Sequence, residues 1–96
     1  MGVPALILEV RRKDMTALVD YGDGVPREVL IGISEERVEP GDIVIVHAGV
    51  VVSKMSREEV VEQIEFFEEA LGEEAEGFVE VYKNILEKHK ALKGGG

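Results

Sequence analysis

The chain has 96 residues, no cysteine and a formal net charge of −9. Its length suits one domain with a modest core, and the lack of cysteine excludes disulfides, thiolate nucleophiles and cysteine-based metal sites in this sequence. The acidic balance disfavours nucleic-acid binding, which depends on Lys and Arg neutralising phosphates. No apolar run approaches the ~20 residues that cross a bilayer, and no signal peptide is evident. We therefore expect a cytoplasmic protein that binds neither nucleic acid nor membrane.

The first half of the sequence alternates between apolar and polar residues with a period of two, which is typical of β-strands. In the first such segment the alternation places Leu6 and Leu8 on one face of the strand and Ile7 on the opposite face. Turn signals follow at Asp23-Gly24 and Pro40-Gly41. Strands are expected within 6–10, 15–21, 28–33, 43–46 and 50–52. Short strands with tight turns predict a small OB-like β-barrel over residues 1–55, in a fold that is mainly β with C-terminal α.

The second half, residues 56–96, changes to a helical period. Ser56 and Glu59 fit a capping box, and the helix that follows is expected to end at Gly72. Its apolar stripe consists of Val60, Ile64, Phe67 and Leu71. A second helix is expected over 74–92, with an apolar seam of Phe78, Tyr82, Ile85, His89 and Leu92. We expect this region to pack on the barrel, to offer its seam as a contact surface within the chain or in a homodimer, and to end in a disordered tail at 94–96.

His47 is the one candidate site residue in the β half, at the end of the most apolar strand. Imidazole is a common metal ligand and a proton carrier near neutral pH. No triad, ligand set, phosphate loop or paired carboxylates accompany it, and a strand-end histidine often only bonds a backbone carbonyl. A structural and a functional role therefore both stay open, and the residues alone indicate a binding module more than an enzyme.

Several motifs, in their order and spacing, resemble the HypC/HupF family of hydrogenase maturation chaperones. They are Gly2-Val3-Pro4, Val19-Asp20-Tyr21-Gly22, Arg27-Glu28-Val29 and the run from Pro40 to Gly49, and the resemblance covers residues 2–71. It implies an OB-like barrel with a C-terminal helix. It also implies a non-enzymatic protein that binds a HypD-like scaffold and then the hydrogenase large-subunit precursor. The iron centre with its cyanide and carbonyl ligands would be carried transiently, with no cofactor bound stably.

By that resemblance, His47 takes the place of the family's metal-contacting histidine. The expected partner-binding residues are Gly2, Val3, Pro4, His47 and Gly49. The family's cysteine, which directly follows the initiator Met and stands three residues before Val-Pro, has no counterpart here. An upstream start, a paralogue that has lost the iron chemistry, and a likeness of the barrel alone are three explanations that stay open.

The long second helix extends beyond what this family is expected to have. The alternative class is an OB-like module that binds nucleic acid or a small ligand. Aromatic side chains for base stacking and a basic groove would favour that class. Only Tyr21 is an aromatic residue on a predicted strand, and the net charge has the wrong sign.

Overall fold

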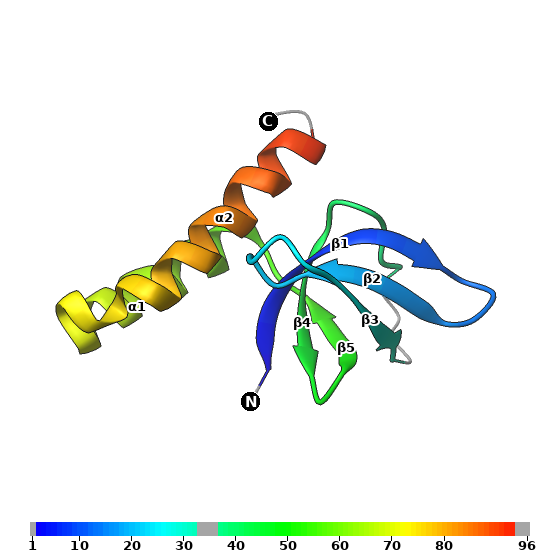
Figure 1. Ribbon diagram of the computed structural model, residues 1–96, viewed down its shortest axis with the longest axis horizontal. Coiled ribbons are helices and arrows are strands. Elements are labelled where there is room, and N and C mark those ends of the chain that lie inside the picture. Colours follow the sequence, from blue (N-terminus) through cyan, green and yellow to red (C-terminus); the bar gives the residue numbers. More distant parts are fainter. Residues whose placement is uncertain (1, 33–36, 94–96) are drawn as a thin grey trace.

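The fold is a β-barrel followed by a helical hairpin that projects from one side of it (Figure 1). The computed structural model describes residues 2–32 and 37–93. The predicted glycine tail at 94–96, and part of the charged connection before Pro40, lie outside the described residues.

Five strands close into the barrel in the order β1-β2-β3-β5-β4. Their bounds are β1 Val3–Arg11, β2 Thr16–Asp20, β3 Pro26–Ile31, β4 Ile43–His47 and β5 Val50–Lys54. All neighbouring strands pair antiparallel except β3 and β5, which close the barrel by a short parallel pairing of Leu30 with Val50 and of Ile31 with Val51. The predicted barrel is thereby confirmed.

The barrel interior is filled by small and β-branched side chains, as expected for a closed sheet of few strands. Its buried members are Ala5, Ile7, Ala17, Val19, Val29, Val38, Val44, Val46 and Val51. The predicted alternation is confirmed in β2 and β3. In β1, however, Leu6 and Ile7 are both fully buried, because Ile7 points into the barrel while Leu6 points outward beneath the helices.

The helical hairpin consists of α1 (Arg57–Leu71), a single 3-10 turn η1 (Gly72–Ala75) and α2 (Glu76–Leu92). The capping box is present: the Glu59 amide donates to Ser56 Oγ over 3.1 Å, and the Ser56 amide donates to Glu59 Oε1 over 2.9 Å. The predicted bounds of α1 are correct. The second helix begins at Glu76 rather than at residue 74, because the 3-10 turn takes up the preceding residues.

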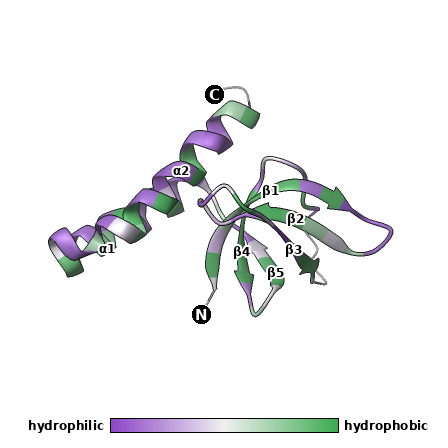
Figure 2. Cartoon of the chain, viewed as in Figure 1, coloured by the Kyte–Doolittle hydropathy of each residue, from purple (hydrophilic) through white to green (hydrophobic). Residues whose placement is uncertain are grey.

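A second core joins the hairpin to the outside of the barrel. Leu6 and Ile43 are its members from the barrel, and Val60, Ile64, Ala75, Val79, Tyr82 and Ile85 are those from the hairpin. The two apolar stripes predicted for the helices are correct near the barrel, where their residues are buried, and wrong at their ends, where their residues are exposed. Leu71, Phe78 and Leu92 are exposed, and Val79 is buried in place of Phe78. The barrel covers only part of the hairpin, so apolar residues remain on its projecting part (Figure 2).

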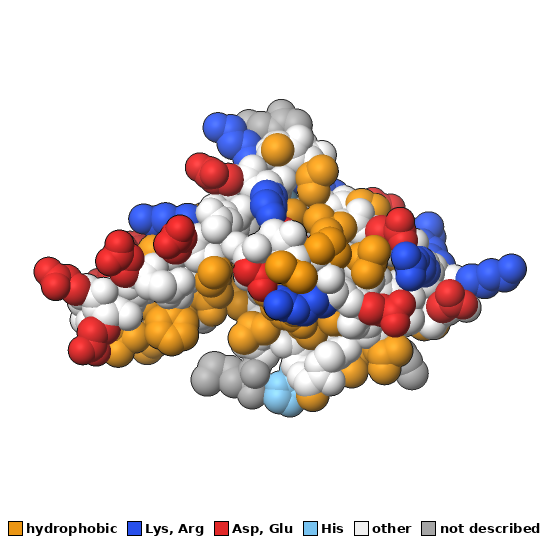
Figure 3. Space-filling view, viewed as in Figure 1, with side chains coloured by type: hydrophobic (Ala, Val, Ile, Leu, Met, Phe, Trp, Pro, Cys, Tyr) orange, Lys and Arg blue, Asp and Glu red, His pale blue; other side chains and the backbone are white. Residues whose placement is uncertain are grey.

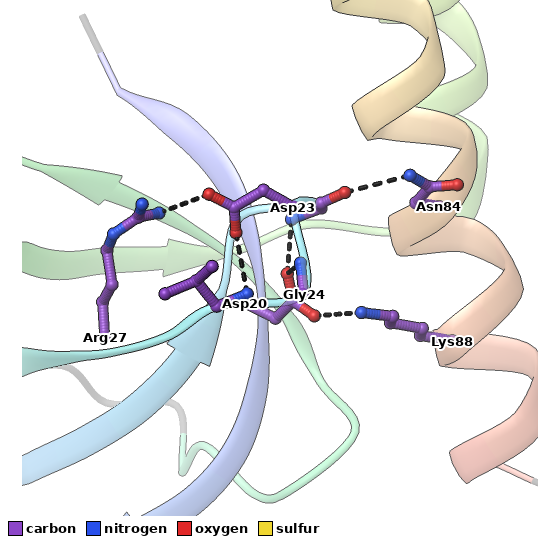
Figure 4. Close-up of polar contacts among 8 residues, drawn as sticks. Asp20, Asp23, Gly24, Arg27, Asn84 and Lys88 are labelled. Atoms are coloured by element: carbon purple, nitrogen blue, oxygen red, sulfur yellow. Dashed lines mark hydrogen bonds and ion pairs between the residues drawn. The ribbon is translucent and has the colours of Figure 1, made fainter.

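A polar clasp also attaches α2 to the turn after β2 (Figure 4). The buried carboxylate of Asp20 accepts bonds from the amides of Gly22 (2.7 Å) and Gly24 (3.0 Å) and pairs with Lys88 of α2. Asn84 Nδ2 donates to the Gly22 carbonyl over 3.0 Å. Burial by itself raises the pKa of Asp20, but the bonds from Lys88, Gly22 and Gly24 outweigh it and hold the pKa below 3.8.

Candidate functional site

The start of the first strand lies beside the end of the fourth. In the antiparallel pairing of β1 with β4, Val3 is opposite Val46 and Pro4 is opposite Ile45. A Cβ atom on Gly2 would lie 3.1 Å from the Val46 carbonyl oxygen and would clash with the Ile45 side chain. Because residue 2 is a glycine, the chain can lie close against β4 at Ile45 and Val46, the two residues that precede His47.

His47 ends β4 and stands at the base of a two-residue hairpin turn. The two turn residues, Ala48 (φ 50°) and Gly49 (φ 79°), both have positive φ, as a type I′ turn requires. His47 pairs with Val50 across the hairpin, and the Leu30 amide donates to the Gly49 carbonyl over 2.8 Å. The strand pairing and this hydrogen bond fix the backbone of the hairpin from which the exposed His47 side chain projects.

Ala48 is one of two non-glycine residues with positive φ among the described residues. Such a conformation costs on the order of 1–3 kcal/mol and is often kept at functional positions. A Cβ atom on the neighbouring Gly49 would have no atom within 4 Å, so the turn faces open space. The hairpin turn therefore presents its tip, beside His47, to solvent.

The five predicted partner-binding residues differ in their access to solvent. His47 and Gly49 are exposed, Val3 is 45% exposed and Gly2 is half-buried. Pro4 is buried and so offers little contact area of its own. The structure brings the N-terminal residues and His47 to one end of the barrel; their role in binding stays a prediction.

Two apolar residues that were not predicted as site residues extend this surface. Leu30 is 56% exposed and pairs with Val50, and Val52, two residues along β5, is 51% exposed. Both point away from the barrel interior, because their neighbours Ile31 and Val51 point into it. The available signal was the alternation in β3, which places an apolar Leu30 on the same face as Glu28.

The metal role predicted for His47 would rest on a single imidazole side chain. Within residues 2–32 and 37–93, the structure has no group of three or more His, Cys, Asp or Glu side chains that could hold a metal ion. The described residues therefore offer His47 no set of further metal ligands. None of the described helices is long and apolar enough to cross a membrane.

The fold and this site together define a small barrel protein that presents a histidine beside its N-terminal strand. The chain belongs to the HupF/HypC family, whose model matches residues 1–67. It is similar to the hydrogenase maturation factor HypC of Helicobacter hepaticus, with 34% identity over 71 residues, which cover 74% of this chain and 80% of that protein. The family match ends within α1, so that α2 lies outside it.

Proposed function

We propose that the protein is a hydrogenase maturation chaperone or adaptor that works by binding other proteins. It binds a HypD-like scaffold, and then the hydrogenase large-subunit precursor, through the start of β1 and the β4–β5 hairpin that carries His47. Membership in the HupF/HypC family and the likeness to a hydrogenase maturation factor support this assignment.

The observation that carries the proposal is the register between β1 and β4. Val3 pairs with Val46, so Gly2 lies beside the end of β4, in the neighbourhood of His47. The exposed apolar side chains of Val3, Leu30 and Val52 at this part of the barrel supply area that a partner can bury. Protein interfaces typically bury apolar side chains at their core and carry polar groups at their rim.

The iron centre with its cyanide and carbonyl ligands is the cargo in this proposal. His47 supplies one nitrogen ligand, and the protein partner supplies the others. One imidazole does not hold iron stably against solvent, so this chain alone should not retain iron.

The test is the affinity of the chain for the scaffold and for the precursor of its own organism, measured by calorimetry. His47→Ala should weaken one of these complexes about tenfold, which corresponds to ~1.4 kcal/mol. The free energy of unfolding should stay within about 0.5 kcal/mol, because the His47 side chain is exposed.

Lys13→Ala is the matched control, since Lys13 is exposed and follows the far end of β1 from Val3. It should leave both affinities unchanged. Absence of binding by the wild-type chain to either protein would refute the proposal. Unfolding of the His47→Ala variant would instead show that the histidine merely holds the strand end in place.

A further inference from the structure

The projecting part of the helical hairpin carries an aromatic patch. We define it as Phe66 and Phe67 of α1 and Phe78 of α2, with Leu71 one turn after Phe67. The rings of Phe67 and Phe78 stack with centroids 5.5 Å apart, and Phe66 meets Phe67 edge-on at 5.9 Å. Phe66 is 63% exposed and Phe78 is 54% exposed, although each has an aromatic neighbour. Exposed apolar clusters of this kind mark interaction sites on small proteins.

Packing of the hairpin itself does not account for the two exposed rings of the patch, Phe66 and Phe78. Ile64, Val79 and Tyr82 already fill the space between the two helices and the barrel. Replacing Phe66 or Phe78 by polar residues would leave that buried core intact. Phe67 is half-buried and packs against this core, whereas the rings of Phe66 and Phe78 add exposed apolar area that the core does not need.

The charges around the patch identify the kind of partner that it fits. From Glu58 to Tyr82 the sequence has ten glutamates and no Lys, Arg or His. Glu62 and Glu69 stand one helical turn on either side of Phe66, and Glu74 stands one turn before Phe78; all three are exposed. In Figure 3, hydrophobic side chains gather along one edge of the hairpin, next to a row of acidic ones.

A second copy of this chain is a poor occupant of the patch. Pairing two hairpins through their patches would bring two sets of these glutamates together, and like charges across an interface cost several kcal/mol. A partner with apolar side chains flanked by Lys and Arg would meet both features of the surface. Its basic groups would also be steered toward the hairpin before contact.

We propose that the aromatic patch is a docking surface for a basic, amphipathic segment of a protein partner. This inference rests on the proposed function in one respect, namely that the partner is one of the maturation proteins. The hairpin then makes a second contact with that partner, separate from the His47 end of the barrel. The aromatic rings supply the buried area, and the glutamates supply specificity and speed of association.

The first test compares Phe66→Gln/Phe78→Gln with the wild-type chain in calorimetry with the scaffold and the large-subunit precursor. The double variant keeps every glutamate, so a purely electrostatic attraction would survive in it. We expect a loss in affinity of about tenfold or more for one partner. Glu62→Gln/Glu69→Gln/Glu74→Gln should weaken the same complex and reduce its dependence on salt.

The matched control is Met15→Gln/Val25→Gln, which removes two apolar residues of similar exposure (48% and 49%) from the turns of the barrel. It should leave the affinity unchanged. If the wild-type chain binds and the phenylalanine variant binds equally well, the inference is wrong and the proposed function stands. Light scattering that shows a wild-type dimer and a monomeric phenylalanine variant would also overturn it, because the patch would then serve self-association.

If neither maturation protein binds the wild-type chain, the proposed function fails and a synthetic probe decides the inference. The probe is an amphipathic helix of leucine and lysine, compared with the same helix made of leucine and glutamate. Preference for the lysine peptide, with about tenfold weaker binding to the phenylalanine variant, supports the docking surface. Equal binding of the two peptides, or no loss in the variant, overturns it.

Discussion

Replacing Leu6 by alanine should lower the free energy of unfolding by about 2–5 kcal/mol. Leu6 is 0% exposed and is one of two barrel residues in the core that the barrel shares with the hairpin. The truncation leaves a cavity between β1 and the helices, which the stiff barrel cannot collapse to fill. Because a domain of this kind is stabilised by only ~5–15 kcal/mol, the loss should be plain in chemical denaturation followed by circular dichroism.

Leu30→Ala is the matched control for this prediction. The same side chain is shortened on a barrel strand, but at a position that is 56% exposed. Its effect should stay within about 0.5 kcal/mol. A loss below about 1 kcal/mol for Leu6→Ala would contradict the assignment of Leu6 to the joint between barrel and hairpin.

Asp20→Asn should cost about 1–3 kcal/mol of stability at pH 7, because charge-assisted bonds to Gly22, Gly24 and Lys88 are weakened at a buried site. The difference from the wild-type chain should depend on pH. The pKa of Asp20 lies below 3.8 in the folded protein, so the folded state binds the proton less readily than the unfolded chain. The stabilisation is therefore complete above pH 3.8 and is lost as the pH falls below that value, through the lowered pKa.

Chemical denaturation of the wild-type chain and of Asp20→Asn at pH 7 and at pH 3 checks this expectation. The difference in free energy of unfolding between the two proteins should be smaller at pH 3. Asp23→Asn is the control, since Asp23 pairs with Arg27 at the surface with its side chain 38% exposed, where water screens the ion pair. It should affect stability less than Asp20→Asn does. If this difference in free energy of unfolding is the same at both pH values, the charge of Asp20 does not stabilise the polar clasp.

Local sequence signals were sufficient for the elements of this fold. The change from a period of two to a helical period after Ser56, together with the capping box, located the start of α1 at Arg57. Alternation located the strands and placed Val29 and Ile31 on the inner face of β3. These signals are reliable because they report on contacts within one strand or one turn of helix.

The sequence identified one part of the candidate site, namely the N-terminal residues and His47, but not the exposed apolar side chains of Leu30 and Val52. The motif that ends in His47 and the start at Gly2-Val3-Pro4 could be read from the sequence. Their proximity depends on the pairing of Val3 with Val46, which joins segments more than forty residues apart. The contribution of Leu30 to the same surface depends on the closure of β3 against β5.

The sequence by itself determined the barrel, the two helices and the acidic surface, because period, capping and charge are properties of neighbouring residues. The tertiary structure decided which apolar faces are covered. Leu6 is buried as fully as Ile7 only because the hairpin lies over the outside of β1. Val79 is buried and Phe78 is exposed because α2 turns that face toward α1 and the barrel, and the hairpin extends past the barrel that could have covered the rest.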